Sequence, residues 1–84
     1  MKIELLYFGR PSENLKLSHE TVIPPPGIAT LGELIAWMRL RGDVWATELT
    51  ESRIRCAINQ EFSDWSALIK DHDEIALFSP ISGG

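Results

Sequence analysis

The sequence predicts an α+β roll in which one main helix packs across one face of a mixed sheet. Two strongly apolar segments, residues 2–8 and 74–78, lie near opposite ends of the chain, and residues 30–42 between them have the pattern of a capped amphipathic helix. Eighty-four residues are enough for one modest core. We therefore expect residues 1–84 to form a single domain that ends in a flexible Gly-Gly tail.

Composition excludes several classes of function. The formal net charge of -4 argues against a nucleic-acid-binding surface. No apolar run approaches the roughly 20 residues that span a bilayer, so we expect no membrane contact. Residues 1–4 contain an early acid and no cleavage pattern, which does not fit a signal peptide. A lone cysteine cannot form an internal disulfide, which fits a cytoplasmic protein.

The first quarter of the chain predicts a β-hairpin. Residues 2–8 are β-rich and apolar, as in a central strand. The Gly, Pro, Ser and Asn of residues 9–14 predict a loop. Residues 19–23 predict a second strand, paired antiparallel with the first. Three prolines and a glycine at residues 24–27 then end that strand and turn the chain.

The helix is the best-defined element. Thr30 and Glu33 have the spacing of a capping box, with Thr30 as N-cap. One apolar stripe follows at helical spacing, formed by Leu31, Leu34, Ile35 and Met38. Arg39 and Arg41 suit the negative end of the helix dipole, and Gly42 is a natural C′ residue.

The second half of the chain predicts a short helix and three strands. Residues 43–49 form the short helix, with Asp43 as its cap. Residues 53–59 alternate as a strand, and after a turn Phe62 begins a short further segment. Residues 74–78 form the last strand, with Phe78 on the face opposite the helix. The first and last strands are the most apolar, and we expect them to pair at the centre of the sheet.

The sequence ends in Gly83-Gly84, two residues that have no side chain. Such an end can thread a narrow channel and adopt backbone angles that other residues cannot. This suits a protein whose own terminal carboxylate reacts. A frayed tail or a cloning remnant is the alternative interpretation.

Two segments, residues 57–61 and 73–84, resemble the bacterial sulfur-carrier proteins, and among them the MoaD-like small subunits of molybdopterin synthases. Val44-Trp45 and the chain length agree. The resemblance implies the β-grasp, or ubiquitin-like, fold. Ser79 replaces the first of two prolines usual in that family, which loosens the tail. His72 replaces a glycine, which implies some left-handed backbone strain.

The resemblance implies a carrier that is not an enzyme by itself and binds no cofactor. A separate activating enzyme would use ATP and magnesium to adenylate the carboxylate of Gly84, and a sulfur donor would convert it to a thiocarboxylate. Gly83 would let the tail thread into the large subunit of molybdopterin synthase. There sulfur would pass to cyclic pyranopterin monophosphate, in a heterotetramer of two small and two large subunits.

Phe8, Phe62 and Phe78 are expected close together on the sheet face that the helix leaves open. A cluster of exposed aromatics predicts a binding surface, and the resemblance adds Pro80 and Ile81 to the residues that contact the partner. The alternative is that the three phenylalanines cap a minor core under a loop.

Other reactive side chains have simpler interpretations. Cys56 alternates with isoleucines in a strand, which favours a buried structural cysteine over a sulfur relay. Residues 71–74 contain three acids and a histidine, but a solvated turn explains them better than metal ligands do, and we predict no metal.

Three other functions remain open at this stage. One is a carrier of sulfur for thiamine thiazole synthesis, although that family is typically shorter. Another is a ubiquitin-like modifier that forms isopeptide bonds with lysines. The last is a binding module whose Gly-Gly end has no chemistry.

Overall fold

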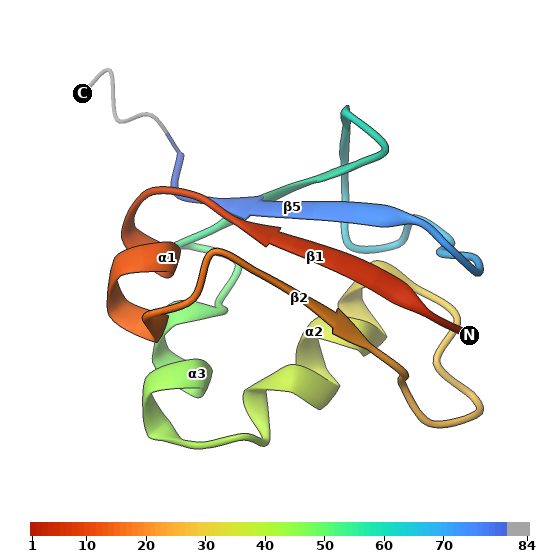
Figure 1. The fold of residues 1–84 in the computed structure, drawn as a ribbon, viewed down its shortest axis with the longest axis horizontal. Helices are drawn as coiled ribbons and strands as arrows, with labels where there is room; N and C mark the ends of the chain where they lie inside the picture. The colour runs from red at the N-terminus through yellow and green to blue at the C-terminus, as the bar shows by residue number, and fades with distance from the viewer. Residues whose placement is uncertain (81–84) are drawn as a thin grey trace.

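A computed structural model describes residues 1–80 of the chain. Five strands form one mixed sheet in the order β2-β1-β5-β3-β4. Figure 1 shows β2, β1 and β5 side by side. The elements along the chain are β1 (Ile3–Tyr7), α1 (Arg10–Leu15), β2 (His19–Val22), α2 (Leu31–Arg39), α3 (Asp43–Glu48), β3 (Arg55–Ile58), β4 (Glu61–Ser63) and β5 (Glu74–Phe78). No helix within residues 1–80 is long and apolar enough to cross a membrane.

The two apolar end segments pair as predicted. β1 and β5 run parallel, with Leu5 opposite Ile75 and Tyr7 opposite Leu77. β2 pairs antiparallel with the outer edge of β1, and β3 pairs antiparallel with β5. β5 is therefore the central strand, hydrogen-bonded on both sides along its length.

The core lies between the sheet and α2. Every second residue of β1 and β5 faces the helix and is buried, because side chains alternate along a strand. The apolar stripe of α2 packs against these buried side chains of β1 and β5. The fully buried apolar side chains of this layer are Ile3, Leu5, Leu31, Leu34, Met38, Ile75 and Leu77.

The start of α2 confirms the predicted capping box. The Thr30 hydroxyl accepts a hydrogen bond from the Glu33 amide at 3.2 Å, and the Glu33 carboxylate accepts one from the Thr30 amide at 3.0 Å. The predicted end of the helix is wrong. α2 stops at Arg39, and Gly42, with φ of +155°, is the N-cap of α3. Asp43 is consequently the first residue of α3 and not its cap.

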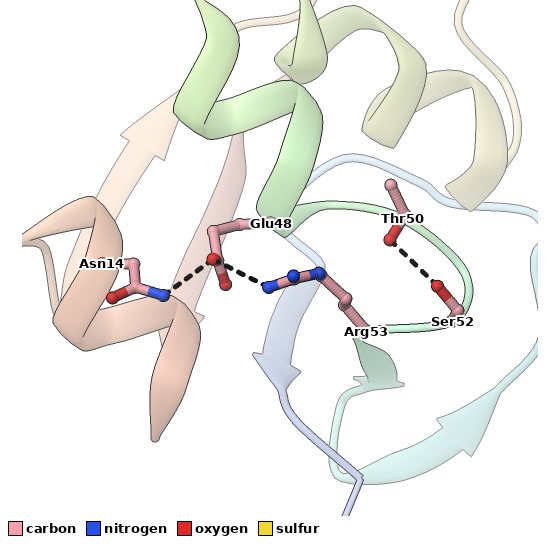
Figure 2. A network of polar contacts seen from close by, with 5 residues as sticks. All are labelled: Asn14, Glu48, Thr50, Ser52 and Arg53. Atoms are coloured by element: carbon pink, nitrogen blue, oxygen red, sulfur yellow. Dashed lines mark hydrogen bonds and ion pairs between the residues drawn. The ribbon is translucent and has the colours of Figure 1, made fainter.

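The predicted loop at residues 9–14 is also wrong, because residues 10–15 form α1. Pro11 lies in the first turn, where its fixed φ favours a helix, and it is buried. At the other end Asn14 donates a hydrogen bond at 2.7 Å to the buried carboxylate of Glu48. Figure 2 shows that Glu48 also faces Arg53, at 3.4 Å, so one carboxylate ties α1, α3 and the following loop together.

The turn between β3 and β4 is a two-residue hairpin at Asn59 and Gln60, whose φ values are +50° and +72°. Glycine reaches such angles without strain, and Asn-Gly is the preferred pair for this turn. We expect Gln60→Gly to stabilise the chain by about 0.5–1 kcal/mol in urea unfolding. Glu61→Gly, one residue later in the extended strand, should destabilise it. A lower unfolding midpoint for Gln60→Gly would contradict this account of the turn.

Candidate functional site

All three phenylalanines singled out in the sequence lie on the sheet face opposite α2. The rings of Phe62 and Phe78 are in contact, with centroids 5.8 Å apart. Phe8 follows β1, and its amide donates to the carbonyl of Leu77, so it lies beside Phe78 on the neighbouring strand. Phe62 is 84% exposed and Phe8 53% exposed. We call these three residues the aromatic face; their assignment to partner binding stays a prediction.

Smaller apolar residues, which the sequence analysis did not single out, fill the floor of this face. Leu6 lies opposite Ala76, Ala76 opposite Ala57, and Ala57 opposite Phe62, so one row crosses four strands. The alternation of side chains along β1 and β5 was enough to predict this row. Leu6 lies on the same strand face as Phe8, and Ala76 lies on the same strand face as Phe78. The row forms a continuous apolar strip across the sheet that ends at Phe62.

The two ends of this sheet face differ in polarity. Where β1 begins, Thr21 donates to the carboxylate of Glu4 at 2.6 Å. Where β5 ends, Phe78 lies beside Phe8, and Arg55 of β3 lies opposite Phe78. The aromatic side chains of Phe8 and Phe78 therefore lie at the end of the sheet at which the chain leaves β5, with one cation next to them.

The chain leaves β5 through Ser79 and Pro80, which are both partly buried. Gly9 packs closely against this exit, since a Cβ at Gly9 would lie 3.2 Å from the Ser79 hydroxyl. Gly9 also has a φ of +66°, which disfavours any side chain there. The predicted reactive residues Gly83 and Gly84, and the predicted contact residue Ile81, lie outside the described residues.

The acidic turn before β5 is hydrogen-bonded to the β3–β4 turn and to the start of the chain. Asp73 is buried and accepts hydrogen bonds from the Asn59 amide group at 2.9 Å and the Lys70 backbone at 2.8 Å. Burial opposes its charge, but these bonds outweigh burial and hold the pKa of Asp73 below its usual value. Asp71 accepts a bond from the Lys2 amide at 2.7 Å, and its pKa is lowered by that bond.

His72 of the same turn has a φ of +70°, the left-handed conformation expected when a histidine replaces glycine. Within residues 1–80, no group of three or more His, Cys, Asp or Glu side chains is arranged to hold a metal ion.

Cys56 lies on the core side of β3 and is 2% exposed, as predicted for a structural cysteine. Burial raises the pKa of its thiol to about 12. The thiol is therefore protonated at neutral pH and is a poor nucleophile.

This sheet order, with α2 across one face, defines a ubiquitin-like β-grasp protein. The chain belongs to the ThiS family, whose profile matches residues 5–84.

Individual relatives agree with this assignment. A molybdopterin synthase sulfur carrier subunit from Haemophilus influenzae is 41% identical over 82 residues, which cover 98% of this chain and 99% of that protein. Among solved structures, SAMP1 of Haloferax volcanii has a TM-score of 0.74 at 26% identity, with both chains covered completely. A complex of subunits 1 and 2 of the molybdopterin-converting factor from Helicobacter pylori gives 0.68 at 25% identity, also with complete coverage of both chains.

Proposed function

We propose that this chain is the sulfur-carrier subunit of a molybdopterin synthase. The observation that carries the proposal is the 41% identity with a protein of that name over nearly the full length of both chains. The family match also extends through Gly84, the residue whose carboxylate would react.

The chemistry of the proposal is confined to the terminal acyl group. A carboxylate is a poor electrophile, so an activating enzyme first joins it to the α-phosphorus of ATP, with magnesium, and releases pyrophosphate. The sulfur of a sulfide-level donor then attacks the acyl carbon and displaces AMP, which leaves a thiocarboxylate on Gly84. In the large subunit this sulfur forms a bond to cyclic pyranopterin monophosphate, and hydrolysis of the acyl–sulfur bond returns the carboxylate of Gly84. The chain supplies the acyl group and its delivery, and the partner enzymes supply the catalytic groups.

The aromatic face supports the docking part of the proposal. Its apolar row and its two exposed phenylalanines form a surface of the kind that protein interfaces bury. It lies at the end of the sheet where the chain continues toward Gly84. A large subunit bound there would receive the tail directly, and two such pairs would form the expected heterotetramer. The relative from Helicobacter pylori was solved as a complex of two different subunits.

The site of sulfur attachment is tested by mass spectrometry. Incubated with the activating enzyme, ATP, magnesium and a sulfur donor, the chain should gain the mass of one oxygen replaced by sulfur, and fragmentation should map it to Gly84. Cys56→Ser should gain the same mass to the same extent, because the protonated, buried thiol takes no part. If the folded Cys56→Ser chain stayed unmodified, sulfur would travel through the thiol and the proposed route would be wrong.

A second candidate is a protein modifier, favoured by the similarity to the small archaeal modifier protein SAMP1. A modifier would pass its activated carboxyl group to lysine amines and form isopeptide bonds. The activated chain should be offered a cell extract and, separately, the large subunit with the cyclic pterin. Conjugates on lysines together with no sulfur transfer to the pterin would replace the carrier proposal with the modifier.

A further inference from the structure

A hollow of about 470 Å³ opens at the side of the aromatic face. It lies between the loop before β3, the ends of β3 and β4, and the loop after β4. The residues that line it are Glu51, Arg55, Cys56, Phe62, Ser63, Asp64 and Trp65. Phe62 belongs to both the hollow and the aromatic face, so a partner that covers one reaches the other.

Two carboxylates give the hollow a negative charge. Asp64 accepts hydrogen bonds from the Ser66 hydroxyl at 2.6 Å and the Ser66 amide at 3.0 Å, and these bonds lower its pKa, so it is ionised at neutral pH. Glu51 is exposed, and within residues 1–80 its carboxylate makes no ion pair.

Arg55 is the cation among the residues that line the hollow, and within residues 1–80 it forms no ion pair with either acid. The Arg55 guanidinium donates to the backbone carbonyls of Glu51, at 2.7 Å, and Ile54, at 2.9 Å. Its charge is directed to backbone oxygens, and its position is fixed by them. The carboxylate of Glu51 is left to attract a second cation.

The walls of the hollow suit a long cationic side chain. Phe62 and Trp65 offer aromatic surface to an aliphatic stem, and a cation over such a ring is attracted by its π-electrons. We propose that the hollow receives a lysine or arginine of the large subunit, with its stem against Phe62 and Trp65 and its charge at Glu51 and Asp64. This inference rests on the proposed function, since it names the chemistry of that partner's contact.

The test is a binding titration of the full chain with the large subunit of the same organism. Glu51→Lys should weaken binding at least tenfold at low salt, because it sets two cations against each other. Glu51→Gln should give a smaller loss. The matched control is Asp43→Lys, which makes the same change of charge on α3, in the layer beyond the other sheet face. It should change the affinity less than twofold, and circular dichroism should show all variants folded.

The salt dependence of the affinity separates the contribution of charge to binding from the contribution of shape. Raising the salt concentration to about 0.5 M should reduce the difference in affinity for the large subunit between Glu51→Lys and the unmodified chain, because ions screen exposed charges. A folded Glu51→Lys chain that binds as tightly as Asp43→Lys would overturn the assignment of the hollow, while the proposed function would stand. If the unmodified chain does not bind the large subunit at all, the proposed function itself fails.

Discussion

A chain that lacks Gly84 should lose sulfur transfer entirely while its thermal unfolding stays unchanged. Removal of one residue withdraws the terminal carboxylate by about 3.5 Å. A misplacement of about 1 Å can already slow a reaction roughly 100-fold, so activation and delivery should both fail. The buried apolar core lies within residues 3–77, which explains the unchanged stability. Molybdopterin formation with purified partners and a melting curve measure the two effects.

Gly84→Ala is the matched control for this deletion. It keeps the length of the chain and adds only one methyl group beside the carboxylate, so it distinguishes lost reach from added bulk. We expect it to retain part of the activity. Molybdopterin formation at the unmodified rate by the shortened chain would refute the proposal that Gly84 carries the sulfur.

Phe78→Ala should weaken binding to the large subunit by about 2 kcal/mol, which is roughly 30-fold. Phe78 is partly buried against Phe62 on the open face, so its removal leaves the α2-side core intact. Leu77, its neighbour in β5, is fully buried on that other side. Leu77→Ala should therefore destabilise the chain by about 2–5 kcal/mol. A binding titration and a urea unfolding curve of each variant separate the two roles.

The opposite result for Phe78 would favour the alternative interpretation of the aromatic face. If Phe78→Ala lost as much unfolding free energy as Leu77→Ala and bound the large subunit normally, the phenylalanines would form a minor core. Both variants truncate a side chain of β5 to alanine, so the comparison depends only on the face of the sheet that each side chain occupies.

Local chemistry predicted those parts of the fold that depend on neighbours in sequence. The capping box of Thr30 and Glu33 spans four residues, and the alternation of residues 74–78 spans five; both are confirmed. The pairing of β1 with β5 followed from their shared apolar character, since the most buried strands lie at the centre of a sheet. The same alternation placed Phe8 and Phe78 on the open face.

The sequence did not predict the features that depend on contacts between residues far apart in the chain. The glycine, proline and asparagine of residues 9–14 favour a turn locally, but the bond from Asn14 to Glu48 and the burial of Pro11 hold a helix there. The hollow was missed for the same reason, because Glu51 and Asp64 come from loops that meet only in the folded chain. Gly42 was assigned to the wrong helix, since a glycine between two helices can end one or begin the next.

The parallel pairing of β1 with β5 also constrains how the chain folds as it leaves the ribosome. β1 and β2 emerge first, but an isolated two-stranded hairpin is marginally stable in water. One backbone edge of β1 stays unpaired until residues 74–78 have been synthesised and β5 can form beside it. Until then the nascent chain exposes an apolar strand with an unpaired edge, which can bind chaperones or aggregate with other chains. Substitutions in β5 should therefore reduce soluble yield during synthesis more than their effect on the finished fold would suggest.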